Sequence, residues 1–199
     1  MIVGRSMQSH IRAVVATHLE VIAGLQALAP DIERFARCVV ACLASGGRVF
    51  WIGNGGSAAD CQHLAAEMVG RYQREREGLA SVALTTDTSI LTSLGNDFGF
   101  EAIFARQVRA LCRAGDVLVG LSTSGSSANV LAAMAAAAEL GVHRIGLTGG
   151  DGGRLRDQAE LSLVVPSDNT ARIQEAHILI GHLVCDLVET ALAGDQARP

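Results

Sequence analysis

Five hydroxyl side chains surround a single glycine in the segment STSGSS, residues 122–127. The segment lies where an apolar run meets an alanine-rich stretch with the pattern of a helix. A helix N-terminus offers free backbone N–H groups with a partial positive charge, and hydroxyls add further hydrogen bonds to an anion. One helix cap would need only one serine. The segment therefore predicts a site for a phosphate monoester, formed by Ser122, Thr123, Ser124, Ser126 and Ser127 around Gly125.

A histidine and a glutamate four residues apart, His63 and Glu67, share one face of the helix that we expect to begin at Ser57. An imidazole and a carboxylate presented together can move protons or bind a metal ion. The same spacing also produces ordinary surface ion pairs. The neighbouring residues are small or apolar, so this helix has little surface to expose, which favours a functional role.

Polar side chains also interrupt the long apolar pattern from Thr170 to about Leu192, which predicts a closing helix. Gln174 and His182 are two four-residue steps apart and share one face of that helix. Glu175 and His177 are equally polar, and the spacing alone does not decide which pair points to solvent.

Two further segments suggest weaker possibilities. Gly95, Asn96 and Asp97 interrupt a helical pattern and could present Asn96 and Asp97 to a polyol, or could form an ordinary turn. Residues 53–58, GNGGSA, match a loose dinucleotide fingerprint, but the acid expected about 20 residues later appears only at Asp87. A nicotinamide enzyme is therefore a minority interpretation. Because the chain has no GxxxxGK[ST] motif, nucleotide hydrolysis is disfavoured.

The elements that must position these residues alternate between strands and helices. Continuous apolar strands followed by helices predict an α/β fold, a three-layer sandwich with a parallel sheet covered by helices on both faces. Ligands of such sheets bind beyond the carboxyl ends of the strands, where both Gly/Ser loops would lie. The expected strands are residues 49–53, 81–85, 116–122, 143–148 and 161–166.

Two helical patterns precede the first strand. An apolar stripe at three- and four-residue steps runs from residue 9 to 28, with Ser9 as its candidate cap. Pro30 and Asp31 suit the first turn of a second helix, which should end before Gly46. The chain of 199 residues fits one domain, 1–199, with an N-terminal helical segment at about 9–46 and a core at about 48–192.

Composition narrows the class of protein. The net charge is −4 and no basic cluster lies near aromatic residues, so a nucleic-acid partner is not expected. Apolar residues make up 49% of the chain, but no uncharged apolar run approaches the roughly 20 residues of a membrane helix, so we expect subunit contacts and no membrane. Five cysteines without CxxC spacing are expected to be reduced core residues. With no signal-peptide pattern, a cytoplasmic protein is the simplest account.

The segments GNGGSAAD, HLAAE, TSLGNDFGFE, STSGSSANV and RIQEAHILIGH together resemble the sugar isomerase (SIS) domain family, and within it the isomerases of heptose phosphates. The resemblance covers nearly the whole chain. It implies a SIS-type α/β fold with a five-stranded parallel sheet and extra N-terminal helices, assembled as a homotetramer with active sites at subunit interfaces. It also implies conversion of the ketose D-sedoheptulose 7-phosphate to the aldose D-glycero-D-manno-heptose 7-phosphate, the first step of nucleotide-activated heptose biosynthesis for lipopolysaccharide or capsule.

The same resemblance implies a role for individual residues. Glu67 would be the catalytic base and His182 its acid partner. One zinc ion per subunit would be bound by His63, Glu67, Gln174 and His182. The substrate would be contacted by Asn54, Gly55, Gly56, Glu67, Asn96, Asp97, Ser122, Thr123, Ser124, Ser127 and Gln174.

Isomerisation of a ketose to an aldose moves a proton from C1 to C2 through an enediol, which requires a base beside the carbon and an acid beside the oxygens. A carboxylate that also ligates zinc is a poorer base, and four protein ligands would close the metal site unless one yields to substrate. We therefore expect zinc to polarise the substrate oxygens or to organise the pocket while Glu67 changes partners.

A competing interpretation comes from another class of protein. The same family includes a non-catalytic regulator of replication that binds the initiator protein DnaA, and in it the residues corresponding to Glu67 and His182 are replaced. Both residues are present here, which favours the enzyme. A sugar-phosphate sensor would need a DNA-binding or partner domain, for which this chain has no room.

Overall fold

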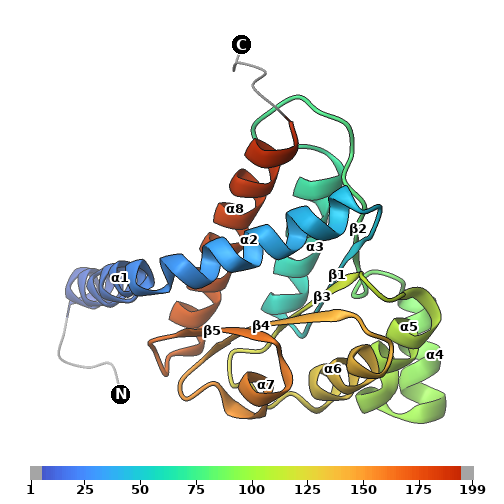
Figure 1. Ribbon diagram of the computed structural model, residues 1–199. Helices are drawn as coiled ribbons and strands as arrows, with labels where there is room; N and C mark the ends of the chain where they lie inside the picture. The colour runs from blue at the N-terminus through green and yellow to red at the C-terminus, as the bar shows by residue number, and fades with distance from the viewer. Residues whose placement is uncertain (1–5, 194–199) are drawn as a thin grey trace.

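The computed structural model describes residues 6–193, which form a five-stranded parallel sheet between two layers of helices (Figure 1). The strand order is β2-β1-β3-β4-β5. This confirms the predicted three-layer α/β sandwich. Three expected strands are one or two residues shorter than predicted, among them β2, after which residues 84–85 form a turn. The strands are β1 (Val49–Gly53), β2 (Ser81–Ala83), β3 (Val117–Leu121), β4 (His143–Gly149) and β5 (Leu161–Val165).

Helices cover both faces of the sheet. One face is covered by α2 (Ala29–Ala44), α3 (Gly56–Val69) and α8 (Thr170–Leu192). The other is covered mainly by α5 (Ile103–Leu111), α6 (Ala128–Glu139) and α7 (Gly153–Gln158), with α4 (Thr88–Phe98) and the short η2 (Phe100–Ala102) packed against α5 and α6. The N-terminal α1 (Met7–Gly24) projects to one side and reaches α2 through η1 (Leu25–Leu28) (Figure 1).

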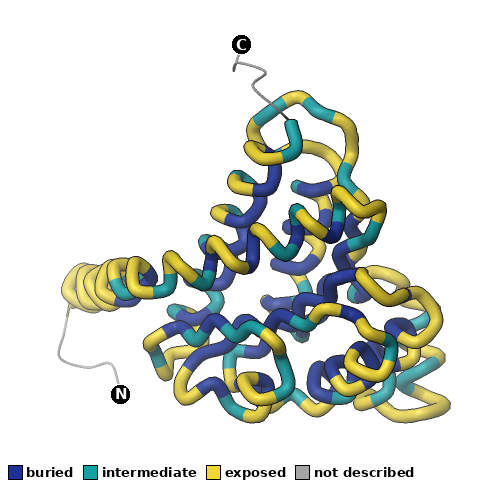
Figure 2. The backbone as a smooth tube through the Cα atoms, in the orientation of Figure 1, coloured by how far each residue is buried: buried dark blue, intermediate teal, exposed yellow. Residues whose placement is uncertain are grey.

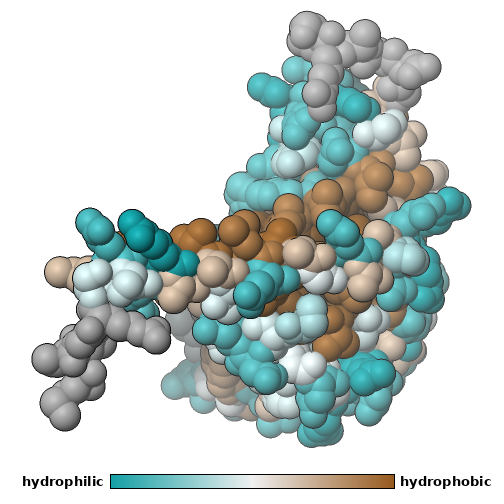
Figure 3. All heavy atoms as spheres, turned by 90° about the vertical axis from the view of Figure 1, so that its left-hand side faces the viewer, coloured by the Kyte–Doolittle hydropathy of each residue, from teal (hydrophilic) through white to brown (hydrophobic). Residues whose placement is uncertain are grey.

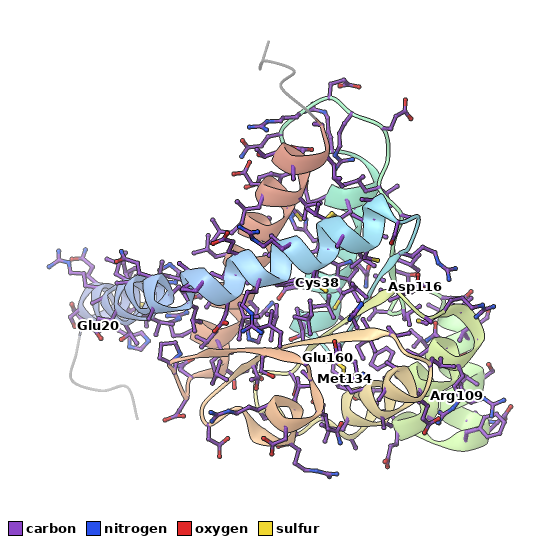
Figure 4. The ribbon with its side chains drawn as sticks, in the orientation of Figure 1. Glu20, Cys38, Arg109, Asp116, Met134 and Glu160 are labelled. Atoms are coloured by element: carbon purple, nitrogen blue, oxygen red, sulfur yellow. The ribbon has the colours of Figure 1, made fainter. Side chains whose placement is uncertain are left out.

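The sheet separates two apolar cores, as the dark blue strands of Figure 2 indicate. Alternate residues of β1 point to opposite faces, so Trp51 packs under α2 and α3 while Phe50 packs toward α5 and α6. Met134 of α6 fills the second core with none of its surface exposed (Figure 4). Burial of every residue of β1 and β3 explains why these strands appear in the sequence as continuous apolar runs.

The cysteines lie where the sequence predicted. All five are free, four are buried, and Cys38 is half-buried on α2 (Figure 4). Burial raises the pKa of the Cys42 thiol to about 11. Burial likewise raises the pKa of Cys112 and of Cys185 to about 12. These thiols are packing residues and not nucleophiles.

Two details of the helices differ from the sequence prediction. The first helix begins at Met7 with Ser6 as its cap, because the Ser6 hydroxyl accepts a hydrogen bond from the backbone N–H of Ser9. The residues Gly95, Asn96 and Asp97 do not interrupt a helix but form part of α4, which ends only at Gly99, where φ is +83°. The pattern around Pro30 was correct, since α2 has proline in its first turn, followed by Asp31.

The stretch Met7–Ala44 is long and apolar enough to cross a membrane by length and composition, although charged residues interrupt it. Its second half is a core helix, because Phe35 and Val39 have no exposed surface. Its first half is tied to α8, because His18 Nδ1 lies 2.7 Å from Glu175 Oε2. The stretch is therefore part of the folded domain.

Candidate active site

The two Gly/Ser loops meet between β1 and β3, where the strand order reverses direction. The chain leaves β1 toward β2 on one side, and leaves β3 toward β4 on the other. Asn54, directly after β1, and Asn129, in the first turn of α6, exchange two side-chain hydrogen bonds of 2.9 and 2.8 Å. Such a reversal point at the carboxyl ends of parallel strands is the usual ligand site of an open α/β sheet.

The side-chain hydrogen bonds of the serine loop after β3 stay within the loop, where the Ser124 hydroxyl accepts the Ser126 N–H and the Ser126 hydroxyl donates to the Ser124 carbonyl. Ser127 is the cap residue of α6, yet its side chain makes no capping hydrogen bond, so helix capping does not explain it. Its hydroxyl instead lies 3.0 Å from that of Ser122, which is 3% exposed. Thr123 is partly buried and Ser124 is exposed. The loop therefore directs several hydroxyls, together with the N-terminus of α6, to one place.

A second glycine-rich segment, residues 149–153 from the end of β4 to the start of α7, braces the serine loop. The backbone N–H of Gly149 donates to the Thr123 carbonyl at 3.1 Å, and that of Leu155 donates to the Gly125 carbonyl at 2.8 Å. The two loops and the start of α8 line a cavity of about 400 Å³, and no lysine or arginine among the described residues lines it. Anion binding there must rely on hydroxyls and amides. The cavity is lined by Thr123, Ser124, Gly149, Gly150, Asp151, Asp168, Thr170 and Ile173.

His63, Glu67 and His182 come together between α3 and α8. The Nε2 atoms of His63 and His182 are 2.9 Å apart, and His63 Nε2 is 3.4 Å from Glu67 Oε1. The side chain of Glu67 is 21% exposed and that of His63 is 49% exposed, so the group borders solvent. The ring of Tyr72 stacks on the His182 ring, with centroids 5.5 Å apart. The predicted acid–base pair therefore lies in one cluster.

Close packing of α3 on α8 makes this meeting possible. Gly181 precedes His182, and a methyl group at Gly181 would come within 2.5 Å of the side chain of Leu64. The absence of a side chain there lets the two helices approach. His63 directly precedes Leu64, and His182 directly follows Gly181. Each helix therefore presents its histidine beside the point of close approach.

Gln174 links this cluster to the glycine loop after β1. Its Nε2 donates to Asp60 Oδ1 at 3.3 Å. A methyl group at Gly56 would be 2.7 Å from both terminal atoms of the Gln174 amide, so a larger residue at Gly56 would displace the Gln174 side chain from its present position. The predicted substrate residues Gly55 and Gly56 are exposed at the start of α3, beside Gln174.

The structure also settles which polar residues of α8 face the site. Gln174 and His182 do, because both contact α3 or the loop that follows it. Glu175 points to α1 and pairs with His18. His177 is fully buried against β4, and its Nε2 lies 3.2 Å from the Thr148 carbonyl oxygen. Burial lowers the pKa of His177 to about 4, so this ring is neutral.

Sequence reasoning missed Asp60. Its side chain is buried beside Gln174, and burial raises the pKa of its carboxyl, although the hydrogen bond from Gln174 and the nearby His63 and His182 oppose that shift. Its Oδ2 has no hydrogen-bond partner among the described residues. The signal was its position seven residues before Glu67, which places both acids on one face of α3.

Two predicted substrate residues do not join the site within this chain. Asn96 and Asp97 are exposed in the last turn of α4 and hydrogen-bond to each other at 2.8 Å. No residue of α4 is buried, and the helix packs mainly on η2 and α5, on the opposite face of the sheet from α3 and α8 (Figure 1). The minority nicotinamide interpretation also loses its support, because the Asp87 carboxylate caps α4 by accepting the Ile90 N–H.

The donors in the cluster suit zinc. Two imidazole nitrogens and a carboxylate oxygen face one another, and an amide oxygen at Gln174 lies on the same helix as His182. Imidazole and carboxylate are ordinary zinc ligands. The side chains as they stand are in contact with each other, and no group of three His, Cys, Asp or Glu within residues 6–193 is spaced to hold a metal ion. Binding would therefore require the side chains to adjust.

Comparison with known proteins agrees with this geometry. Residues 12–149 match the family model described as SIS domain. The chain belongs to the SIS domain family. A SIS-domain relative from Geobacter metallireducens, named phosphoheptose isomerase, is 55% identical over 187 residues, which cover 94% of this chain and 99% of the relative. Another of that name, from Rhodospirillum rubrum, is 55% identical over 186 residues, covering 94% and 99%.

Solved structures extend the similarity to the fold. Phosphoheptose isomerase from Neisseria gonorrhoeae matches with a TM-score of 0.88 at 47% identity, covering 92% of this chain and 99% of that one. A phosphoheptose isomerase from Francisella tularensis matches with a TM-score of 0.89 at 39% identity, covering 92% and 98%. The fold is thus shared over nearly the whole length of both solved chains.

Proposed function

We propose that this SIS-domain protein is an aldose–ketose isomerase that converts D-sedoheptulose 7-phosphate to D-glycero-D-manno-heptose 7-phosphate. The observation that carries the proposal is the meeting of Glu67 with two imidazoles between α3 and α8, because the first turn of α8 also lines the cavity beside the serine loop. Relatives named phosphoheptose isomerase at 55% identity support the substrate class. No structural feature favours the regulator that binds DnaA.

The spacing along α8 fits a seven-carbon substrate. Ile173 lines the cavity beside the serine loop, and His182 lies nine residues further along the same helix. That separation corresponds to roughly 14 Å along the helix axis. A heptose phosphate with its phosphate against Thr123 and Ser124 extends along this helix toward His182. Its C1 and C2 then approach the acid–base cluster.

The chemistry assigned to this cluster is a proton transfer. Glu67 takes a proton from C1 of the ketose, which leaves an enediol, exchanges that proton with solvent, and then protonates C2. His182 moves the proton between the two oxygens. Gln174 and Asn54 orient the sugar hydroxyls, and the serine loop fixes the phosphate, so the reacting carbons stay beside the carboxylate.

Zinc is proposed as the cofactor, bound by His63, Glu67, Gln174 and His182. Support comes from the donor chemistry and from the contacts of His63 with both other ionisable donors. When bound, zinc would act as a Lewis acid on the substrate oxygens. The protein residues keep their own tasks of binding, orientation and proton transfer.

The protein is further proposed to be a cytoplasmic homotetramer with active sites between subunits. Exposed apolar side chains line α1, and Figure 3 shows a band of apolar atoms across the side from which this helix projects. Such a surface is suited to a subunit interface. A neighbouring subunit would also bring Asn96 and Asp97 to a site that they do not reach within their own chain. The large exposed apolar residues of α1 are Met7, Ile11, Val14, Val15 and Leu19.

The proposed activity is tested by incubating the purified protein with sedoheptulose 7-phosphate and recording proton NMR spectra. New anomeric signals of an aldose are expected, and they should not appear with fructose 6-phosphate at the same concentration. If sedoheptulose 7-phosphate binds but is not converted with or without added zinc, the protein is not this isomerase.

A further inference from the structure

The loop of residues 70–80, between α3 and β2, is held by one buried carboxylate. Glu189 of α8 is 1% exposed and accepts hydrogen bonds from the backbone N–H groups of Tyr72, Gln73 and Arg74 at 3.0, 2.7 and 2.8 Å. Three backbone donors on one carboxylate fix the path of the loop across the C-terminal part of α8.

Arg76 connects the same carboxylate to the end of α3. Its side chain is 6% exposed, and its Nε lies 3.1 Å from Glu189 Oε1, in ionic contact but without hydrogen-bond alignment. Its two terminal nitrogens donate to the carbonyl oxygens of Glu67, Met68 and Gly70 at 2.9, 2.9 and 3.2 Å. A cation is suited to the carbonyl end of a helix. The last turn of α3, which carries Glu67, is therefore tied to α8.

Tyr72 reaches from this loop to the acid–base cluster. Its ring stacks on the His182 imidazole with an interplanar angle of 25° and a centroid separation of 5.5 Å. Glu189 lies seven residues after His182, two turns along the same face of α8. Glu189 and His182 are thus on the same helix, α8. Glu189 holds the backbone of Tyr72, and His182 supplies the ring on which Tyr72 stacks.

We propose that Tyr72, Arg76 and Glu189 are positioning residues for the isomerisation, which together fix the relative placement of Glu67 and His182. The Arg76–Glu189 pair locks the end of α3 to α8, and Tyr72 holds the plane of the His182 ring. This inference rests on the proposed function, in which those two residues act on the same pair of carbons.

We assign the Arg76–Glu189 pair a role beyond stability because a buried ion pair often contributes little net free energy to folding. Apolar residues of similar volume often do as well, whereas a charged pair fixes one geometry. Proton transfer depends steeply on geometry, and a misplacement of about 1 Å can lower the rate roughly 100-fold. A rigid link between the helices of the base and the acid supplies that geometry.

The first test compares Tyr72→Leu with Tyr72→Phe, using the purified protein with its own metal content. Tyr72→Leu removes the flat ring and should lower kcat for sedoheptulose 7-phosphate ~10-fold or more, with KM changed less than about twofold, because the phosphate loop is untouched. Tyr72→Phe keeps the stacking and should retain kcat within about twofold. Glu75→Gln, at an exposed position of the same loop, is the matched control and should behave as wild type. Full kcat in a folded Tyr72→Leu protein would overturn the proposal.

The second test does not depend on activity. Tyr72 is the only tyrosine of the chain, so selective labelling of tyrosine and histidine rings gives one tyrosine spin system. We expect a nuclear Overhauser effect between this ring and the His182 ring, assigned with His182→Gln. The His182 ring signals should move downfield in Tyr72→Leu, as the ring current is lost, and should move little in Tyr72→Phe. Absence of the Overhauser effect in the wild-type protein would overturn the proposal even if Tyr72→Leu failed to fold.

These outcomes separate the two claims. A wild-type protein without turnover but with the Tyr72–His182 contact would contradict the proposed function, and with it the role of the three residues in that reaction. A wild-type protein with turnover and no dependence of kcat on the ring at Tyr72 would leave the isomerase standing and remove only the positioning role. Arg76→Lys and Glu189→Gln then test the ion pair, and both should lower kcat more than KM rises.

Discussion

His63 of α3 and His182 of α8 face each other with their Nε2 atoms 2.9 Å apart, although 119 residues separate them in the chain. At this distance one ring donates and the other accepts a hydrogen bond. Glu67 Oε1 lies 3.4 Å from the same nitrogen of His63. Two helices from distant parts of the chain thus bring three groups to one point, and this arrangement distinguishes a site from an ordinary surface ion pair.

The proposed zinc site predicts the metal content of a variant. His63→Ala removes one of four donors and should lower the zinc bound per subunit from about one to well below one, measured by plasma mass spectrometry after dialysis. Since His10 is exposed on α1, His10→Ala is the matched control and should keep its zinc. Equal zinc in both variants would contradict the assignment of His63 as a ligand.

The serine loop predicts a defect in binding and not in chemistry. Ser124→Ala removes a hydroxyl from the cavity wall, and a hydrogen bond to a charged group is worth ~1.5–3 kcal/mol, so KM for sedoheptulose 7-phosphate should rise about 10- to 100-fold. The value of kcat should change far less. Ser45→Ala lies at the end of α2, on the amino-terminal side of the sheet, and should leave KM unchanged. A KM unaltered by Ser124→Ala would place the phosphate elsewhere.

The buried His177 predicts how stability depends on pH. Burial lowers its pKa from 6.5 to about 4, so between these values the unfolded chain binds a proton that the folded chain does not. The free energy of unfolding should therefore rise with pH across this window. A difference of this size corresponds to roughly 3 kcal/mol, fully present above about pH 6.5 and lost as the pH falls toward 4.

Urea unfolding at several pH values checks this dependence. His177→Gln keeps a donor for the Thr148 carbonyl and should flatten the slope between pH 4 and 6.5, while His143→Gln, at an exposed site, should not. If the slope were the same in wild type and His177→Gln, His177 would not be the group responsible.

The apolar side of α1 predicts a change of assembly. Leu19 is 61% exposed, and a charge there would be desolvated in any interface, so Leu19→Glu should shift the protein to smaller species in analytical ultracentrifugation. Arg12→Glu, a charge change on the same helix, should affect assembly less. A wild-type protein that sediments as a monomer would refute the proposed tetramer and would leave Asn96 and Asp97 without a site.

Features that depend on neighbouring residues in the sequence were predictable, and features that depend on contacts between distant residues were not. The strands, α8 and the helix of His63 were predictable, because apolar periodicity and Gly/Ser turns are local. The sequence did not predict which polar residues of α8 face the site. Only the contacts with α3 and β4 show that His182 lines the site while His177 is buried. Gly95, Asn96 and Asp97 were expected to interrupt a helical pattern, but α4 continues through Gly95 at a modest cost in stability.

The features that the sequence did not predict depend on partners that are distant in the chain. Asp60 gave only its spacing of seven residues from Glu67, and that spacing is ordinary in a helix until Gln174 packs beside the acid. The contacts of Glu189 with the Tyr72 loop join residues 117 apart, and nothing in either segment alone predicts them. The sequence therefore predicts the fold and the chemical groups, and the structure supplies the partners that orient them.

The most direct test of the account is the reaction of sedoheptulose 7-phosphate in D2O, followed by proton NMR with wild type, Glu67→Gln and the exposed control Glu20→Gln. We expect an aldose that carries deuterium at C2 for wild type and control, and a rate lowered ~10²–10⁴-fold for Glu67→Gln in a folded protein. Aldose formation at the wild-type rate by Glu67→Gln, or none by the wild-type protein, would contradict it.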